Sequence, residues 1–326
     1  MFEISRRSFF VGGGAALGVA AMPSVLRAAI VNKLKSPFKV AVITDEISHD
    51  FDHACSVAAN DFGMQWVELR AMWKKSLFSL TSAEIEEARR ILVKYDLRVT
   101  DIGSPLFKVD WPDAPLPKKR GNRDKHSADF TFKQQNEVLE KSIELAKTFQ
   151  TDRVRGFDFW RLDDQKPYRD AINAKLSETA DKLGKQGIVF ILENEMDCNT
   201  GSGAEAAKVL AAIPNPNLML NWDAGNAATL GEITFPDAWN LLPKNRIGHV
   251  HCKDAVKKPD GSGWEWAPVG KGVINWTGQF KALKKLGYHL GISLETHWHG
   301  GSSPEDSTRQ SWAGMKAALQ AAGTLA

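Results

Sequence analysis

Four residues of metal-ligand type close four successive apolar runs in the second half of the chain. The runs end in LEN, NWD, HVH and LET, which supply Glu193, Asp223, His251 and Glu295. Each run is short and rich in Val, Ile, Leu or aromatic residues, as expected of a buried β-strand. The first two gaps between the four residues match one strand–helix unit, and the third matches one unit with an insertion. The pattern predicts one site at neighbouring strand ends.

Three carboxylates and one imidazole at one point would repel one another strongly without a cation. A divalent metal turns the same four side chains into a typical ligand set. Mostly oxygen donors with a single nitrogen favour Mn²⁺, Mg²⁺ or Co²⁺, and Zn²⁺ and Fe²⁺ also fit. We therefore predict one divalent metal ion per chain, with Mn²⁺ as the first choice, held by Glu193, Asp223, His251 and Glu295.

Eight strand-like runs alternate with helical patterns along the chain. A capping-box pair, Thr81 and Glu84, and the pair Ser303–Pro304 mark two helix starts. This alternation predicts an α/β fold, a single-domain (β/α)₈ TIM barrel over residues 36–326. An open doubly wound sheet is the alternative, but no glycine-rich turn follows the first strand. The expected strands lie near residues 39–46, 65–70, 97–105, 153–160, 188–195, 217–226, 247–254 and 291–298.

The barrel fold predicts how the side chains of the HVHCKD stretch point. Side chains alternate along a strand, so His249, His251 and Lys253 share one face. If that face is the barrel interior, His251 lies near the mouth and His249 one layer deeper, where it forms hydrogen bonds rather than binding metal. Glu68 is expected to point into the same interior, with Arg70 behind it.

The N-terminal region has the pattern of an export signal. Arg6 and Arg7 precede two phenylalanines and a run rich in Gly and Ala. This order resembles a twin-arginine signal, here residues 1–28, and predicts a periplasmic protein. A Sec signal or a short membrane anchor is the alternative. No later apolar run reaches the ~20 residues of a membrane span, so no stable membrane association is expected after signal removal.

Composition limits the partners of the protein. The net charge is +3 and no long basic run occurs, so we expect no nucleic-acid partner. The three cysteines, Cys55, Cys198 and Cys252, are too few and too scattered for a disulfide framework or a zinc motif, and are expected to be buried. Homo-oligomer formation is left open.

Several motifs resemble those of one large family. The stretches ILENE, LNWDAGN, RIGHVHCKDA, PVGKG and SLETH resemble the xylose isomerase-like barrel superfamily, from about Phe38 to the C-terminus. That superfamily includes sugar-phosphate isomerases and epimerases, ketose 3-epimerases and the family-2 AP endonucleases such as endonuclease IV. The resemblance implies a metal held by Glu193, Asp223, His251 and Glu295 at the ends of strands five to eight, and a small carbohydrate as the substrate.

The chain departs from two branches of this superfamily. Extra metal-binding histidines of the nucleases fall where this chain has Asn226, Trp264 and Trp266. A three-zinc nuclease site is therefore not expected. Ketose 3-epimerases have a histidine at the position of Asn226 and a glutamate at that of Asn199. The metal centre is retained, whereas the surrounding substrate-binding residues differ.

Four residues near the strand ends are the predicted substrate contacts: Arg155, Asn226, Lys253 and His297. Arg155 either holds an anionic or hydroxylated substrate or forms a salt bridge. Lys253 either meets an enolate or phosphate oxygen or pairs with Asp254 or Glu295. His297 is expected to line the mouth. No cofactor other than the metal is predicted.

Glu193 and Glu295 are the predicted catalytic pair, because two carboxylates on opposite sides of a substrate can remove and return a proton. The first hypothesis is a metal-dependent sugar isomerase or epimerase that forms an enediolate. The alternative is a lyase that cleaves 3-keto-glycosides or oxidised sugars by β-elimination. A non-catalytic sugar-binding barrel or an endonuclease IV-like nuclease ranks below both.

Overall fold

Eight parallel strands form the centre of the protein, in a computed structural model that describes residues 33–118 and 130–326. Their order is β1-β12-β9-β8-β7-β6-β5-β2, and a parallel bridge between Ile43 and Glu68 links the two ends. All eight predicted strands are present and the barrel is nearly closed, so the (β/α)₈ prediction is confirmed. The strands are β1 (Lys39–Val42), β2 (Trp66–Leu69), β5 (Arg98–Ile102), β6 (Arg153–Gly156), β7 (Val189–Glu193), β8 (Leu218–Asp223), β9 (Ile247–Cys252) and β12 (Gly291–Leu294).

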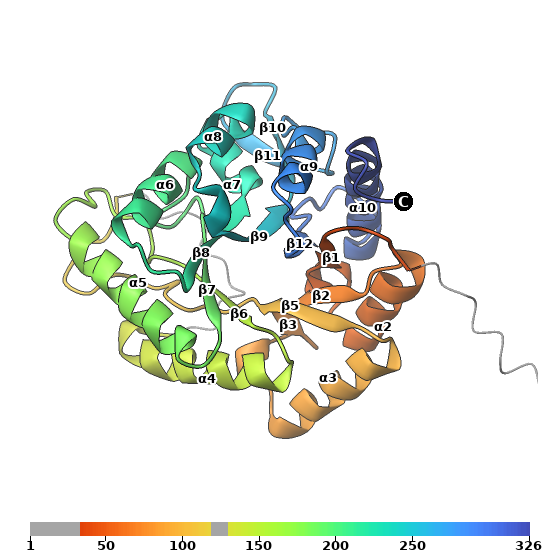
Figure 1. Cartoon of the computed structure of the whole chain (residues 1–326), viewed down its shortest axis with the longest axis horizontal. Helices are drawn as coiled ribbons and strands as arrows, with labels where there is room; N and C mark the ends of the chain where they lie inside the picture. The colour runs from red at the N-terminus through yellow and green to blue at the C-terminus, as the bar shows by residue number, and fades with distance from the viewer. Residues whose placement is uncertain (1–32, 119–129) are drawn as a thin grey trace, which may run out of the picture. The chain divides into compact units, whose positions relative to one another are not determined.

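Helices surround the strands (Figure 1). The predicted starts are confirmed: Thr81 and Glu84 form a complete capping box, and Ser303 caps the last helix ahead of Pro304. The α-helices are α1 (Thr44–Ile47), α2 (Phe51–Ser56), α3 (Ser82–Lys94), α4 (Gln135–Thr148), α5 (Arg169–Gly184), α6 (Gly203–Ala212), α7 (Ala224–Thr229), α8 (Trp239–Leu241), α9 (Trp276–Lys285) and α10 (Pro304–Ala321). Short 3₁₀ or π turns are Val57–Asp61, Leu77–Ser79, Phe132–Gln134, Thr234–Ala238 and Lys244–Arg246.

Two antiparallel hairpins extend the carboxyl ends of strands. β3 (Ala71–Met72) pairs with β4 (Lys75–Ser76) after β2, and β10 (Asp254–Lys257) pairs with β11 (Trp264–Ala267) after β9. The second hairpin is the insertion predicted between His251 and Glu295. It carries Trp266, whose ring lies 5.5 Å from that of His297.

The PVGKG turn is fixed by Asp254, the last residue of HVHCKD. The Asp254 carboxylate accepts hydrogen bonds from the backbone N–H groups of Gly270, Gly272 and Ile274. A Cβ at Gly272 would lie 2.1 Å from Asp254 Oδ1, so a side chain does not fit there. Asp254 thus anchors this turn directly after Lys253.

Burial follows the two-layer pattern of a barrel. Strand side chains that face outward pack against the helices in one core, and all three cysteines are buried and unpaired, as predicted. In the described residues, no helix combines the length and the hydropathy needed to cross a bilayer. The predicted signal, residues 1–28, lies outside the described residues.

Candidate metal centre and active site

The four predicted metal ligands meet at the carboxyl ends of β7, β8, β9 and β12. One donor atom from each of Glu193, Asp223, His251 and Glu295 lies within 4.8 Å of all the others. Strand register explains this, because Asp223 is paired with His251, and His251 with Ser293, two residues before Glu295. All four side chains are buried. The structure therefore brings together side chains up to about 100 residues apart in the chain, as expected where barrel strands end.

Asn194, the last residue of the LEN motif, holds Asp223 in place. Its Nδ2 donates to the carbonyl oxygen of Asp223 at 2.8 Å, and its Oδ1 accepts from the Asp223 N–H at 2.8 Å. Asn226 donates from its backbone N–H to Asp223 Oδ1 and from its side-chain amide to the carbonyl of Asn194. These bonds fix Asp223 with Oδ2 toward the other ligands. Asn226 is thereby placed as a support of Asp223.

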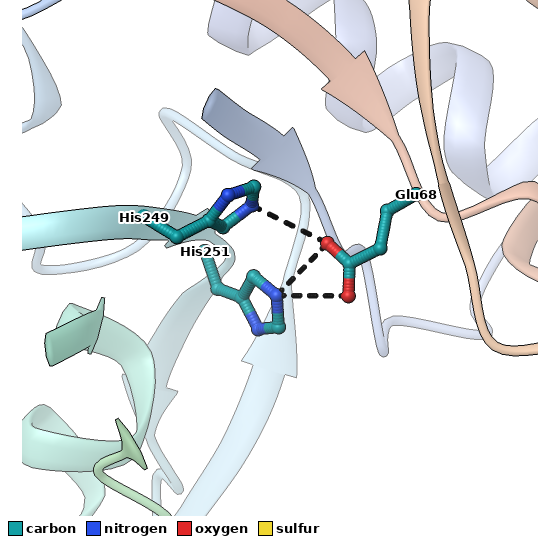
Figure 2. A group of neighbouring side chains, drawn as sticks. All are labelled: Glu68, His249 and His251. Atoms are coloured by element: carbon teal, nitrogen blue, oxygen red, sulfur yellow. Dashed lines mark hydrogen bonds and ion pairs between the residues drawn. The ribbon is translucent and has the colours of Figure 1, made fainter. Parts of the chain in front are cut away.

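The imidazole of His251 lies between two sets of carboxylates. Its Nε2 lies 3.1 Å from Glu68 Oε2, and its Nδ1 lies 3.1 Å from Glu193 Oε1 and 3.0 Å from Glu295 Oε2. Figure 2 shows Glu68 reaching His251 from across the barrel. With a proton on Nε2 donated to Glu68, the lone pair of Nδ1 faces the predicted metal ligands. A carboxylate that orients a ligating histidine in this way is common in metal sites.

His249 lies one layer deeper, as the alternation along β9 predicts. Its Nε2 lies 2.9 Å from Ser293 Oγ and 3.4 Å from Glu68 Oε2. Its Nδ1 lies 3.5 Å from Asp101 Oδ1. Because both ring nitrogens face partners inside the barrel, His249 supports Glu68 and does not face the four-ligand cluster.

Three cationic side chains surround the cluster. Lys253 Nζ lies 2.8 Å from Asp223 Oδ2 and 2.9 Å from Glu295 Oε2. Arg155 Nη1 lies 3.2 Å from Glu193 Oε2. Arg70 Nη1 lies 2.9 Å from Glu295 Oε1. Of the alternatives for Lys253, the structure therefore has the ion pair with Glu295, whereas Asp254 is occupied with the PVGKG turn.

Arg70 also forms ion pairs with two carboxylates other than Glu295. Its guanidinium donates to Asp45 and Glu46, each at 2.8 Å, and it is buried. One planar side chain thus joins the ends of β1 and β2 to Glu295 after β12. Sequence reasoning placed Arg70 near the site but did not give it this role, because its partner Glu295 is far away in the chain.

The charges of the cluster fix the protonation of its members in the absence of metal. Burial raises the pKa of Glu193, but His251 and Arg155 outweigh it and bring the pKa to about 2. Burial also opposes ionisation of Glu295, yet Lys253, His297 and His251 hold its pKa well below the usual range. Both members of the predicted catalytic pair are therefore ionised at neutral pH.

Asp223 and His251 shift the other way. Burial raises the pKa of Asp223 to about 7, against the attraction of Lys253 and with repulsion from Glu193 and Glu295. Burial would lower the pKa of His251, but the nearby carboxylates of Glu68, Glu193 and Glu295 raise it well above its ordinary value. The shift of Asp223 thus reflects its burial first, whereas the shift of His251 reflects the carboxylates around it.

The donor set fits a divalent metal ion. Glu193 Oε2 and Asp223 Oδ2 are buried oxygens without a hydrogen bond among the described residues. Arg155 and Lys253 approach these two oxygens as charges, without hydrogen-bond geometry. A divalent cation would bind buried carboxylate oxygens of this kind together with the imidazole nitrogen beside them. Packing alone does not explain why four such residues meet at one point.

Two of the predicted substrate contacts, Arg155 and His297, differ in access. Arg155 is buried, with its Nη1 3.2 Å from Glu193 Oε2 and 4.0 Å from Glu68 Oε1. The side chain of His297 is 30% exposed, and its Nε2 lies 3.0 Å from Glu295 Oε1. His297 therefore lies between Glu295 and the opening of the barrel.

A cavity of about 660 Å³ lies at this opening. Arg70, His297 and Trp266 line one part of it, and Lys108, Trp160 and residues 195–197 line another. The Lys253 ammonium lies 5.1 Å from the centre of the Trp266 ring. Arg70 and His297, which both contact Glu295, therefore lie between the cavity and the four-residue cluster.

The protein is a nearly closed (β/α)₈ barrel with acidic and imidazole side chains at the ends of its strands. Its broad class is therefore that of barrels with an enzyme-type site. The family model for the xylose isomerase-like TIM barrel matches residues 57–318. The chain belongs to this family.

Three proteins are similar to this chain in sequence or in structure. A protein of Escherichia coli K12, provisionally assigned as the L-ribulose-5-phosphate 3-epimerase SgbU, is 22% identical in a 275-residue alignment that covers 80% of this chain and 94% of that protein. The probable 3-DHS dehydratase AsbF of Bacillus anthracis has a TM-score of 0.64 at 19% identity, covering 86% of this chain and 98% of AsbF. The IOLI protein, solved with a bound zinc atom, has a TM-score of 0.66 at 14% identity, covering 88% and 98%.

Proposed function

We propose that this protein is a divalent-metal-dependent sugar isomerase or epimerase. Glu193, Asp223, His251 and Glu295 would hold one metal ion, with Mn²⁺ as the first choice. When bound, the metal would supply a Lewis acid that polarises a substrate carbonyl and its neighbouring hydroxyl. The similarity to an epimerase and to a zinc-binding barrel supports a carbohydrate substrate and a divalent metal.

The proposed proton transfers use the two glutamates. Glu193 closes β7 and Glu295 follows β12, and β8 and β9 lie between these strands in the sheet. The two carboxylates can therefore approach a substrate carbon from different sides. One removes the proton next to the carbonyl to give an enediolate, and the other returns a proton. Return to the opposite face gives an epimer, whereas return to the adjacent carbon gives an aldose–ketose isomer.

Lys253 would act on the oxygen of the enediolate. Its ammonium is buried between Asp223 and Glu295, and the carboxylates hold its pKa well above the ordinary value despite the burial. It therefore stays charged, and a fixed positive charge near a developing negative oxygen stabilises the transition state.

The observation that supports this proposal most is the state of the two glutamates. Both are buried, the pKa of each is lowered by the cationic groups around it, and both lie about 3 Å from the same imidazole nitrogen. A protein that only binds sugar needs hydrogen-bonding groups, not two buried ionised bases at a metal-type site. The experiment is solvent deuterium incorporation by ketoses, 3-keto-glycosides and sugar phosphates with Mn²⁺ present. Deuterium at the carbon next to the carbonyl is expected, and its absence from all three classes would refute the proposal.

The second candidate is a lyase, supported by the size of the cavity and by the similarity to a probable dehydratase. In a 3-keto-glycoside, removal of the C2 proton is followed by cleavage of the bond from C1 to the glycosidic oxygen. The electron pair forms the C1–C2 double bond, and the released oxygen takes a proton and leaves as the alcohol. Release of a free alcohol by the same carboxylate pair would distinguish the lyase from the epimerase.

We also propose periplasmic delivery by the twin-arginine route, from Arg6 and Arg7 in the sequence. This route exports folded proteins, which suits an enzyme that binds its metal before crossing. Replacing both arginines with lysine should leave the precursor in the cytoplasm. Unchanged delivery of the folded double variant to the periplasm would show that another route is used.

A further inference from the structure

We infer that the substrate is an uncharged sugar with a second ring or aglycone, which binds at the rim of the cavity formed by residues 195–197 of the β7–α6 connection. We call this rim the outer subsite. The inference rests on the proposed function, because it assigns the reacting sugar ring to the part of the same cavity that Arg70 and His297 line, next to Glu295. It concerns the class of substrate rather than the chemistry at the carbonyl.

The cavity is wider than one sugar ring needs. A ring of roughly twelve non-hydrogen atoms fills ~200 Å³ at the packing density of protein interiors. The cavity has about 660 Å³. Even with several bound waters, this volume accommodates two rings side by side, within the range of sites for ligands of that size.

The two parts of the cavity lie on opposite sides of the barrel. Arg70 follows β2, Glu46 follows β1 and His297 follows β12, and these strands are neighbours around the barrel. The outer subsite follows β7, which β9 and β8 separate from β12. A ligand that contacts both His297 and Asp197 must therefore cross the mouth of the barrel.

The outer subsite is built on a braced loop. Asp158 is fully buried, and its carboxylate accepts from the Thr200 N–H at 2.8 Å and from the Thr200 hydroxyl at 2.6 Å. Asn199 is also buried and donates to the Asp158 carbonyl at 2.8 Å. The backbone carbonyl of Asp197 accepts from the Arg161 N–H. Two strand-end loops thus hold residues 195–197 in place without a ligand.

The charges of the cavity disfavour a phosphate. Both basic side chains of the Lys or Arg type that line it pair with carboxylates: Arg70 with Asp45, Glu46 and Glu295, and Lys108 with Glu195 at 3.4 Å. Asp197 adds a further carboxylate. An anionic substrate would have to displace one of these pairs to bind Arg70 or Lys108, whereas carboxylates of this kind readily accept hydrogen bonds from sugar hydroxyls.

The experiment compares three matched ketones: methyl 3-keto-α-D-glucoside, 3-keto-glucose 6-phosphate and 3-keto-trehalose. Deuterium exchange at C2 gives kcat/KM, and isothermal titration calorimetry gives Kd. We expect 3-keto-trehalose to lead in both measurements by tenfold or more. Asp197→Ala should raise Kd for 3-keto-trehalose about tenfold and leave the methyl glycoside unchanged, the loss expected for one hydrogen bond to a charged group.

Glu265→Ala, on the exposed side of β11, is the control and should change neither Kd. Any of three results would overturn the proposed outer subsite. These are tighter binding of the phosphate, equal binding of the one-ring and two-ring ketones, and an unchanged Kd for 3-keto-trehalose in Asp197→Ala. These results are independent of turnover. Exchange of the one-ring ketone alone would leave the proposed function intact, whereas preferential binding of the two-ring ketone without any exchange would contradict the proposed function and support the subsite.

Discussion

The two halves of the barrel contribute to the site in different ways. In the half formed by β7, β8, β9 and β12, every strand ends in or beside a side chain of metal-ligand type. In the half formed by β1, β2, β5 and β6, the inward side chains hold those ligands: Arg70 binds Glu295, Glu68 binds His251 and Arg155 lies against Glu193. The first half supplies the donors together with local support from Asn194, Asn226 and Lys253, whereas the second half supplies only support, from across the barrel.

This difference has a physical reason. A ligand must be of a particular chemical type and must lie at a strand end, and both properties are local. An orienting residue must reach a partner across the barrel, so its role depends on closure of the sheet. If this division is correct, changes in the first half should abolish the chemistry, whereas changes in the second half should weaken it.

The largest effect is expected for Glu193→Gln and Glu295→Gln. Glutamine keeps the size and one oxygen donor but cannot act as a carboxylate base. Each variant should stay folded, keep some metal and lose about 10²–10⁴-fold in kcat, the usual contribution of a positioned base. The two losses should not add, because both residues serve one sequence of steps. Turnover within a few-fold of the parent in both variants would limit these residues to metal binding.

Solvent exchange separates the roles of the two glutamates. The variant that lacks the first base should no longer exchange the substrate α-proton with solvent. The variant that lacks the second base can still exchange it but should not form product. Circular dichroism and metal content provide the controls for folding and loading.

A smaller effect is expected from Glu68→Gln in the supporting half. The amide keeps the size of the side chain but removes the charge that fixes the His251 tautomer through Nε2. Loss of such a partner typically costs about 10–100-fold in metal affinity. Competition with a chelator measures that affinity, and Glu265→Gln on exposed β11 is the matched control. An unchanged affinity would show that Glu68 does not orient His251.

The smallest change to the protein is one of pH alone, which should also alter the metal affinity. The pKa of His251 in the metal-free protein is raised well above its ordinary value, and that of Asp223 is raised to about 7. Metal binding must therefore displace protons, so affinity should rise as pH rises. We expect about tenfold per pH unit above pH 7 and a steeper rise below it, where Asp223 is also protonated. A flat profile from pH 6 to pH 8 would mean that neither residue binds the metal.

The ligand half was accessible from the sequence and the supporting half largely was not. The runs that end in LEN, NWD, HVH and LET gave strand positions and donor types together, and the alternation along β9 placed His249 correctly as a hydrogen-bonded interior residue. Glu68 was expected inside the barrel, but its partner His251 is 183 residues away, and Arg70 is 225 residues from Glu295. Pairs between residues so far apart in the chain become visible only when the barrel is closed.

The sequence also did not predict the role of the small polar residues beside the four proposed ligands. Asn194 and Asn226 were visible in LEN and DAGN, yet their hydrogen bonds to Asp223 and to each other depend on the turn geometry after β7 and β8. The sequence did contain one signal for this role, an asparagine close after an acidic strand end, which occurs twice, at Asn194 and Asn226. It indicates a brace for the neighbouring strand end.

The most direct measurement is the metal content of the mature protein after purification without chelators, beside that of His251→Ala. One metal centre at Glu193, Asp223, His251 and Glu295 predicts about one equivalent of divalent metal per chain. It also predicts that His251→Ala stays folded but loses most of the metal. Three equivalents of zinc, or a folded parent protein that binds no divalent metal even when Mn²⁺ is supplied, would contradict the proposed centre.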